Sequence, residues 1–456
     1  MMLTKDLINE FKHDDINKHL PDLKYKIIVL DDDPTGTQTV KDLPVYTKWT
    51  EEWIEDGFLQ SHNMFYILTN SRALNEEETI SLHQEVSANI QKVANKLDIP
   101  YLIISRGDST LRGHFYLEPK VLSESSDQAF DAVFYIPAFF EGNRYTYEGI
   151  HYLKEGEQYI PVSESEFAQD TTFGFKSKHM NDFISEKSNA EVRSDEVYHI
   201  TLENIRQRDK ETIFNVFSNL NDFDQVVVDA VNDKDMDFFV ACLTEFLGQH
   251  DKRFIFRTAA SFVKAICETP GEIINLNSYK ENDNGGIIVV GSHVKKSSDQ
   301  LKYLLDHSFI SEIEFDVTQI ASSNLQAYVD DITQLVERYI DNGEDVVIYT
   351  SRDVIRTENL QHNLSISTAI SNSLVSIVSN LDVQPKFIIA KGGITSSDVA
   401  TKGLKIEKAK VIGQITQGVP VWLTGPEAKY QNIPYVIFPG NVGDEETLSS
   451  VYELNR

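Results

Sequence analysis

The chain has 456 residues, of which 41% are hydrophobic and 25% are charged, and its formal net charge is −29 at pH 7. This composition is ordinary for a globular protein, and the length allows two or three domains. The negative charge argues against partners such as nucleic acid or an anionic membrane surface, but it leaves room for a local basic site that binds a small anion.

Short apolar runs alternate with longer amphipathic stretches along the whole chain. One such stretch, from Leu325 to Tyr339, repeats apolar residues at steps of three and four and predicts a helix with one buried face. Continuous apolar strands that alternate with helices favour an α/β fold with largely parallel sheets. The predicted strands are Lys26–Leu30, Met64–Leu68, Tyr101–Ile104, Ala132–Ile136, Val197–Ile200, Val226–Val228, Phe254–Phe256, Ile287–Val290, Ile313–Phe315, Val346–Tyr349, Phe387–Ile389 and Val436–Phe438.

A polar run at Asn277–Asn284, followed by Gly285 and Gly286, has the composition of a linker. We therefore expect two domains, residues 1–276 and 285–456. Each is predicted to contain a largely parallel sheet flanked by helices, with ligands in the crevice between the domains. The irregular stretch from Glu155 to Lys187 is left without an assigned structure.

The chain contains two cysteines, Cys242 and Cys267, which form neither a CxxC pair nor a disulfide framework. Both are predicted to be buried thiols, as is common for free cysteine. The segment Met1–Asp15 lacks the apolar core of a secretory signal, and no apolar run approaches the length that spans a bilayer. A cytoplasmic location is therefore expected.

The first motif is the acidic triplet Asp31, Asp32 and Asp33, directly after the first predicted strand. Carboxylates crowded in this way repel one another unless a cation or an arginine compensates them, so the triplet is more typical of a site than of a core. The alternative is a solvated acidic turn with Pro34 and Gly36 at its bend.

The same triplet resembles the Asp-x-Asp-x-Thr motif of haloacid-dehalogenase-type phosphatases. In that interpretation Asp31 is the nucleophile, Asp33 is the general acid, and Leu68–Ser71 is the second motif. The later segment Asp229–Asp233 is a poor match to the acidic magnesium motif of those enzymes, so the phosphatase stays an alternative.

Arginines follow two further predicted strands: Arg72 after Met64–Leu68, and Arg106 and Arg112 after Tyr101–Ile104. Arginine forks match carboxylates and phosphates. Asp108 lies among these arginines and is our first candidate for a general base that accepts a proton from a substrate hydroxyl, with Asp33 as the second. The alternative to a substrate site is that an arginine and an aspartate of this segment simply pair with each other and stabilise the local structure. The cluster suits a substrate with one carboxylate and several hydroxyl groups.

A third segment, Pro137–Thr146, follows the strand Ala132–Ile136, and its Asn143 and Arg144 are within reach of a polar ligand. His114 and His151 are isolated, and no metal-ligand spacing is found, so the metal ligands are not assigned.

Three small-residue turns follow strands in the last third of the chain: Gly291-Ser292, Lys391–Ser396 and Pro439–Asn441. Such turns let the backbone approach an anion closely, and together they indicate a phosphate-binding crevice at the carboxyl ends of a sheet. Neither a P-loop nor a kinase glycine loop is present, so a nucleotide would be held by another arrangement. Lys391 and Lys295 are candidates to lie near phosphates.

Taken in order, these motifs resemble those of the four-carbon acid sugar kinase family over nearly the whole chain. The matching segments are Asp31–Thr37, Asn70–Arg72, Asp108–Gly113, Pro137–Asn143, Glu164–Asp170, Val228–Ala230, Gly291-Ser292, Gln300-Leu301, Thr350–Arg352, Gly392–Ser396, Pro439–Gly443 and Thr447-Leu448.

The resemblance implies a sugar-acid-binding N-terminal domain and a nucleotide-binding C-terminal domain. The implied activity is ATP- and Mg²⁺-dependent phosphorylation of threonate, erythronate or an oxo-tetronate in carbohydrate catabolism. The predicted substrate-binding residues are Asp32, Arg72, Arg106, Ser109, Arg112 and Asn143. By resemblance, Ser292, the turn Gly393–Ser396 (with Thr395) and Gly440 fall where ATP contacts are expected. Lys391, Gly392 and Asn441 are predicted with them as ATP-binding residues.

The chain departs from the family pattern at Ile394, where an acidic residue is frequent, and at Phe438, where a lysine is frequent. Both departures remove a polar group near the expected phosphates, so a non-catalytic sensor of sugar acid and nucleotide stays a third alternative. A sugar acid and ATP are the expected ligands, no nucleic acid or membrane partner is expected, and assembly as a homodimer stays open.

Overall fold

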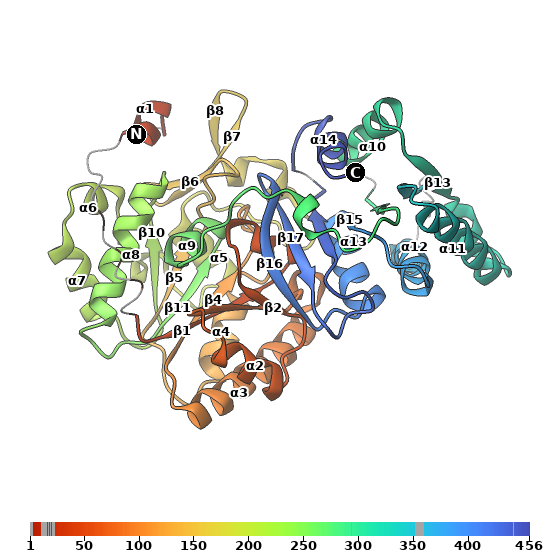
Figure 1. Ribbon diagram of the computed structural model, residues 1–456. Helices are drawn as coiled ribbons and strands as arrows, with labels where there is room; N and C mark the ends of the chain where they lie inside the picture. The colour runs from red at the N-terminus through yellow and green to blue at the C-terminus, as the bar shows by residue number, and fades with distance from the viewer. Residues whose placement is uncertain are drawn as a thin grey trace. The chain divides into compact units, whose positions relative to one another are not determined.

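The computed structural model describes residues 3–10, 16, 18, 20, 23–292, 294–351, 360–440 and 442–456, without the side chains of residues 360–365 and 367. The chain divides into two compact units, Met1–Pro270 and Gly271–Arg456. Both have the α/β architecture that the alternating pattern predicts (Figure 1).

The first unit is built on a parallel sheet with the strand order β2-β3-β1-β4-β11-β5-β10-β9. Its central strands are buried on both faces, which explains why they are continuous apolar runs in the sequence. The strands are β1 (Lys26–Asp31), β2 (Pro44–Tyr46), β3 (Met64–Leu68), β4 (Tyr101–Arg106), β5 (Ala132–Ile136), β9 (Tyr198–Ile200), β10 (Asp224–Val228) and β11 (Phe254–Thr258). A separate antiparallel sheet is formed by β6 (Arg144–Tyr147), β7 (Ile150–Glu155) and β8 (Gln158–Pro161).

Helices cover both faces of this parallel sheet (Figure 1). On one face Ile54 and Val86 belong to the same core as Ile28 and Ile103 of the sheet. On the other face, Phe217 and Phe239 pack their rings against Phe134. The helices of the first face are α2 (Glu51–Leu59), α3 (Glu76–Leu97) and α4 (Leu117–Glu124), and those of the second are α6 (Leu202–Arg206), α7 (Lys210–Asn219), α8 (Asp233–Leu247) and α9 (Ala260–Ile266). Elsewhere in the unit lie α1 (Lys5–Asn9) and α5 (Met180–Lys187).

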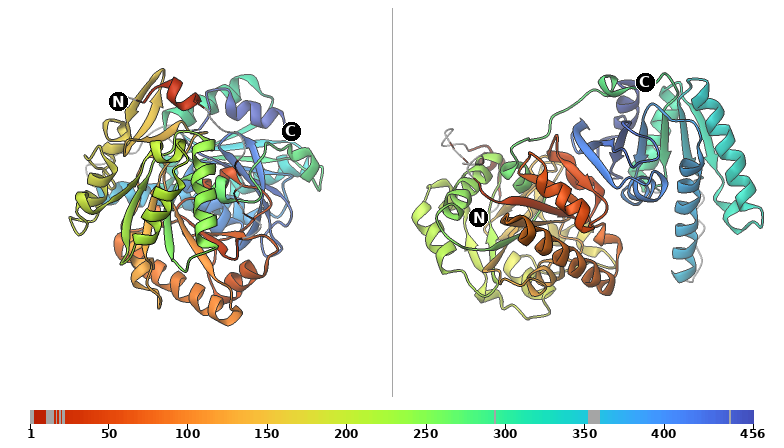
Figure 2. Two further views of the ribbon diagram at one scale, coloured as in Figure 1. Left: turned by 90° about the vertical axis from the view of Figure 1, so that its left-hand side faces the viewer. Right: turned by 60° about the horizontal axis from the view of Figure 1, so that its bottom comes forward.

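The second unit has a mixed sheet with the strand order β13-β14-β12-β15-β18-β17-β16, in which β16 and β17 are antiparallel and the other strands are parallel. The strands are β12 (Ile287–Val290), β13 (Ser311–Phe315), β14 (Val346–Thr350), β15 (Ile388–Lys391), β16 (Lys408–Thr416), β17 (Val419–Thr424) and β18 (Pro434–Phe438). The helices are α10 (Lys295–His307), α11 (Leu325–Asp341), α12 (Leu360–Asn380), α13 (Gly393–Asp398) and α14 (Thr447–Glu453). The long helices α11 and α12 run side by side (Figure 2).

Each strand predicted from an apolar run is present, with shifts of a few residues at its ends. Three shifts matter for the site, because they place charged residues inside strands. Arg106 is the last residue of β4, Arg257 lies within β11, and Lys391 ends β15. The stretch from Glu155 to Lys187, left unassigned above, contains β8 and α5. Cys242 and Cys267 are free and buried, as predicted.

Candidate functional site

The candidate residues of the first unit lie at the carboxyl ends of its parallel strands. The register pairs Asp31 with both Leu68 and Arg106, and Arg106 with Thr258. The segments that follow β1, β3, β4 and β11 therefore begin at one level along one edge of the sheet. The acidic triplet and the arginine motifs meet at this edge, as the sequence predicts for strand-end segments.

Arg72 holds two members of the acidic triplet. Its Nη2 donates to Asp32 Oδ1 at 2.6 Å, its Nε donates to Asp32 Oδ2 at 3.2 Å, and its Nη1 donates to Asp33 Oδ2 at 3.3 Å. The Asp32 side chain has no exposed surface, whereas 21% of the Arg72 side chain is exposed. The arginine therefore neutralises the buried carboxylates and still faces solvent in part, where an anionic ligand can reach it.

Asp31 is held by the second arginine, since Arg106 Nη1 donates to Asp31 Oδ1 at 3.3 Å. Asp31 is 1% exposed, and its Oδ2 has no hydrogen-bond partner among the described residues. Burial raises the pKa of this carboxyl to about 7, although Arg106 opposes the change. A Cβ added at Gly36 would collide with the carboxylate, so that backbone covers it. A nucleophile must reach phosphorus, and this burial does not support the phosphatase role considered for Asp31.

Asp33 has a different environment from Asp31. Its Oδ1 accepts hydrogen bonds from the backbone N–H and the hydroxyl of Thr35, at 2.9 and 2.6 Å. Burial raises the pKa of Asp33, but Arg72 and Thr35 outweigh this effect and the pKa falls below its ordinary value. Asp33 is therefore an ionised carboxylate that caps the short helix Pro34–Thr39.

Asp108 lies in the loop after β4 and is already paired within the protein. Arg112 Nε donates to its Oδ2 at 2.8 Å, and the Thr110 hydroxyl donates to the same oxygen. Burial would raise the pKa of Asp108, but Arg72 and Arg112 lower it far below the ordinary range. The internal Arg–Asp pair considered from the sequence is present, so in this conformation Asp108 is an ionised and weakly basic carboxylate.

Ser109 and Asn143, two other predicted substrate residues, make different contacts within the protein. The backbone carbonyl of Ser109 accepts a hydrogen bond from His151 Nε2 at 2.8 Å, which ties the loop to β7. Asn143 is exposed in a left-handed turn with φ +60°, and its Oδ1 accepts a hydrogen bond from Tyr145 at 3.2 Å. Burial lowers the pKa of its neighbour Arg144, and the charge of Asp108 opposes this change.

Sequence reasoning missed a buried pair beside this cluster, Glu118 of α4 and Arg257 of β11, which are each 1% exposed. Arg257 had a signal: a charge inside an otherwise apolar strand. Glu118 had none, because it occupies an ordinary position in an amphipathic helix.

In the second unit the three small-residue turns lie at one edge of the sheet. The register pairs Val290 with Lys391 and Lys391 with Phe438, so β12, β15 and β18 end at the same level. Gly392 has φ +113°, a conformation that favours glycine, and an added Cβ there would lie 3.1 Å from Ser292 Cβ. The turns after β12 and β15 therefore touch.

A cavity of about 300 Å³ lies at these turns, near the lower limit for ligand pockets. Its walls combine glycine and hydroxyl groups with aliphatic side chains from α12, which suits phosphate on one side and an apolar ring on the other. The lining residues are Gly291, Ser292, Ile370, Ser371, Leu374, Gly392, Gly393, Ile394 and Thr395.

The other predicted ATP residues have structural partners. The Ser396 hydroxyl donates to the carbonyls of Gly392 and Gly393, at 2.8 and 3.0 Å, within the first turn of α13. The Gly440 carbonyl accepts from Ser297 Oγ at 3.2 Å, which attaches the third turn to α10. Asn441 lies outside the described residues.

Lys391 is fully buried at the end of β15. Its Nζ donates to the carbonyl of Pro439 at 2.7 Å and lies 4.1 Å from the centre of the Phe438 ring. No described carboxylate pairs with it. Burial, with a smaller contribution from the charge of Lys296, lowers the pKa of Lys391 to about 7. A lysine in this state would become fully charged when an anion arrives.

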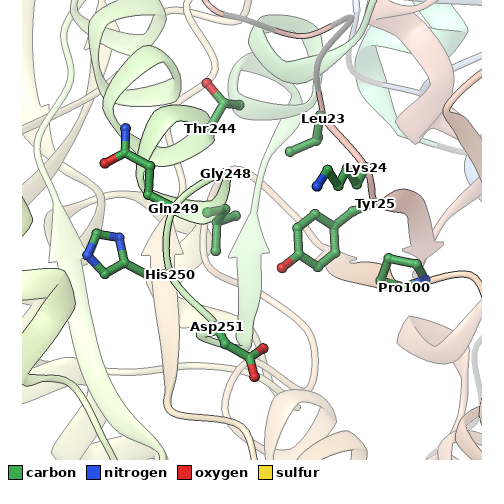
Figure 3. A pocket seen from close by; sticks show the side chains of 10 residues that line it. Leu23, Lys24, Tyr25, Pro100, Thr244, Gly248, Gln249, His250 and Asp251 are labelled. Carbon is green, nitrogen blue, oxygen red and sulfur yellow. The ribbon is translucent and has the colours of Figure 1, made fainter.

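Another cavity, of about 260 Å³, lies in the first unit at the opposite edge of the sheet (Figure 3). Tyr25 and Pro100, which directly precede β1 and β4, line one side, and Gln249 and His250, which follow α8, line the other. No predicted site residue lines this cavity.

Within the described part of the chain, no three His, Cys, Asp or Glu side chains gather in a way that could hold a metal ion. Magnesium bound to a nucleotide takes most of its ligands from phosphate and water, so it needs one or two carboxylates at most. Over the same described residues, no helix is both long enough and apolar enough to cross a membrane.

Comparisons with known proteins agree with this division into two units. A family model described as a sugar-binding N-terminal domain matches residues 27–266, and one described as a nucleotide-binding C-terminal domain matches residues 287–448. Among curated proteins, none matches the chain significantly.

Solved structures share the fold at low sequence identity. A protein of Salmonella typhimurium LT2, provisionally named a tRNA synthase, is 16% identical, with a TM-score of 0.67 over 92% of this chain and 97% of that one. Haemophilus influenzae protein HI1011, of the family DUF1537, is also 16% identical, with a TM-score of 0.63 over 93% of this chain and 99% of that one.

Proposed function

Because this chain belongs to the family that joins a sugar-binding N-terminal domain to a nucleotide-binding C-terminal domain, we propose that it is an ATP-dependent kinase of a four-carbon sugar acid. The observation that carries the proposal is the arginine cluster of the sugar-binding unit, formed by Arg72, Arg106 and Arg112, two of which are partly exposed. Arg72 and Arg112 keep 21% and 25% of their side chains exposed while they neutralise the carboxylates beneath them. Such a cluster suits a small acid with several hydroxyl groups.

In this proposal Arg112 exchanges partners when the substrate binds. Its guanidinium, which now lies 5.0 Å from the centre of the Phe167 ring, moves from Asp108 to the substrate carboxylate. The pKa of Asp108 then rises from its depressed value, because one of the two arginines that lower it has moved. Asp108 becomes a better acceptor for the proton of the reacting hydroxyl, and Asp33 stays the second candidate.

The nucleotide phosphates are proposed to bind at the turns of the second unit. Glycine at 291, 392 and 393 leaves the backbone accessible, and Ser292 and Thr395 line the same cavity. Lys391 would supply positive charge from within the sheet. Bound ATP supplies the phosphoryl group, and Mg²⁺ held mainly by phosphate oxygens would neutralise it.

The direct test is a screen of threonate, erythronate and oxo-tetronates with ATP and Mg²⁺. Turnover is measured as ADP release, and the product is identified by mass spectrometry. We expect ADP to form only with a suitable acid, together with a phosphorylated acid. ATP and acid binding without turnover would favour the sensor, and hydrolysis of sugar phosphates without ATP would favour the phosphatase. Either outcome would refute the kinase.

The two units are expected to divide the ligands between them. Arg112→Ala should weaken sugar-acid binding by about 2–5 kcal/mol, the range for removing one partner of a buried charge pair, and leave ATP binding nearly unchanged. Gly392→Ala should weaken ATP binding and spare the sugar acid, because a side chain at φ +113° strains the turn and crowds Ser292. Calorimetric titration of each variant with each ligand measures both effects. The reverse pattern would show that the ligands are assigned to the wrong units.

A further inference from the structure

The buried pair Glu118–Arg257 joins the ends of several strands in the first unit. Arg257 Nη1 donates to Glu118 Oε2, and it also donates to Ser105 Oγ at 2.7 Å. The same carboxylate accepts hydrogen bonds from Ser71 at 2.7 Å and from Ser105 at 2.8 Å. One glutamate of α4 thus connects the segment after β3 with β4 and β11, directly beside the arginine cluster.

The free end of Arg257 packs against the loop that carries Asp108 and Arg112. Its Nη2 has no hydrogen-bond partner among the described residues. A Cβ added at Gly107 would lie 2.5 Å from this nitrogen, and one at Gly113 would lie 3.5 Å from it. These glycines stand at the two ends of the loop, so the guanidinium leaves no room for a side chain at Gly107 and would be in van der Waals reach of one at Gly113.

Stability alone does not account for this arrangement. A buried ion pair is often no more stabilising than apolar residues of the same volume, and an unpartnered buried N–H adds a cost. The two glycines bring the backbone close to a charge that the substrate cannot touch, because Arg257 is only 1% exposed.

We infer that the Glu118–Arg257 pair positions the loop 107–113 and thereby sets the affinity of the first unit for its anionic substrate. The inference rests on the proposed sugar-acid site. Arg257 is a positioning residue, which acts through the backbone at Gly107 and Gly113 on the side chains of Asp108 and Arg112.

Two variants disturb the contact between Arg257 and the loop, one by changing the arginine and the other by changing the loop. Arg257→Lys keeps the charge but loses the planar fork. Gly107→Ala keeps both members of the pair and pushes the guanidinium away from the loop. Each should weaken binding of the sugar acid selected by the screen by at least about tenfold, because small misplacements of a site are costly. ATP affinity should stay unchanged, and the double variant should be no weaker than the worse single variant.

The matched control is Arg206→Lys. Arg206 pairs with Asp235 in the same unit, with Nε–Oδ1 and Nη2–Oδ2 distances of 2.9 and 3.1 Å and side chains 12% and 5% exposed. The pair joins α6 and α8 and does not touch the loop 107–113. Arg206→Lys should lower the melting temperature as Arg257→Lys does, and it should leave sugar-acid affinity unchanged.

Hydrogen exchange of the loop amides gives a readout that needs no ligand. The amides of residues 107–113 should exchange faster in Arg257→Lys and Gly107→Ala than in wild type or Arg206→Lys. Unchanged loop exchange, or unchanged affinity in Gly107→Ala, would overturn the inference even if Arg257→Lys failed to fold. If no sugar acid binds the wild type, the proposed function fails, and the exchange rates still decide whether the pair positions the loop.

Discussion

Arg72→Met is expected to destabilise the first unit by about 3–5 kcal/mol, because removing one partner of a buried ion pair leaves the other charge uncompensated. Arg72 makes two hydrogen bonds to Asp32, whose side chain has no exposed surface, and one to Asp33. Adding Asp32→Asn to Arg72→Met should recover part of the loss, since the uncompensated charge is then removed. Urea denaturation and calorimetry of the full chain measure both effects.

The control for this prediction is Arg193→Met. Arg193 Nη2 lies 2.7 Å from Asp195 Oδ2, which is close to the 2.6 Å between Arg72 Nη2 and Asp32 Oδ1. The side chains of Arg193 and Asp195, however, are 68% and 70% exposed. An exposed pair of this kind contributes little to stability, because solvent screens the attraction between the two charges. A loss in Arg72→Met no larger than in Arg193→Met would contradict the view that burial, rather than distance, gives the arginine cluster its energy.

Lys391→Met is expected to stabilise the second unit below pH 7 and to weaken ATP binding. Burial lowers the pKa of this lysine from 10.5 to about 7. Each pKa unit corresponds to about 1.4 kcal/mol, so a protonated Lys391 costs the folded state at most about 5 kcal/mol. Methionine fills the same space without a charge and removes this cost. The same substitution removes the buried positive charge that is proposed to attract the phosphates.

The pH dependence follows from proton counts in the two states. Between pH 7 and 10.5 the unfolded chain holds the proton and the folded chain releases it, so the stability of the wild type rises with pH over this range. Below pH 7 both states are protonated and the cost is complete. The advantage of Lys391→Met in urea denaturation should therefore be large at pH 6 and smaller at pH 9. Equal advantages at both values would contradict the lowered pKa, and exposed Lys302→Met should show no such trend.

The sequence predicts the parallel strands other than the short β2, because burial on both faces produces uninterrupted apolar runs, as in Ile287–Val290. It does not predict β16 and β17. There the register shifts around Gly413, which has φ +135°, and the shift disrupts the regular alternation of buried and exposed side chains. The strands β6 to β8 were also missed, since short antiparallel strands of mixed composition lack a periodic signal.

The types of residue in the site were also predictable, because motifs after parallel strands meet at one edge. The pairing was predictable only in part. The bond between Arg112 and Asp108 of the same loop was one of the alternatives that the sequence offered, whereas the bonds from Arg72 to the segment after β1 were not foreseen. Glu118 and Arg257 are 139 positions apart and belong to no local motif, so only the folded chain brings them together.

The two buried cysteines have a practical consequence for work in solution. Both thiols belong to the first unit, and burial raises the pKa of Cys242 to about 12 and that of Cys267 above its ordinary value. The thiolate is the form that reacts with maleimides, so the native chain should resist such dyes while it stays folded. The second unit contains no cysteine at all. A single thiol introduced there would carry a fluorophore at one known position, without removing either native cysteine.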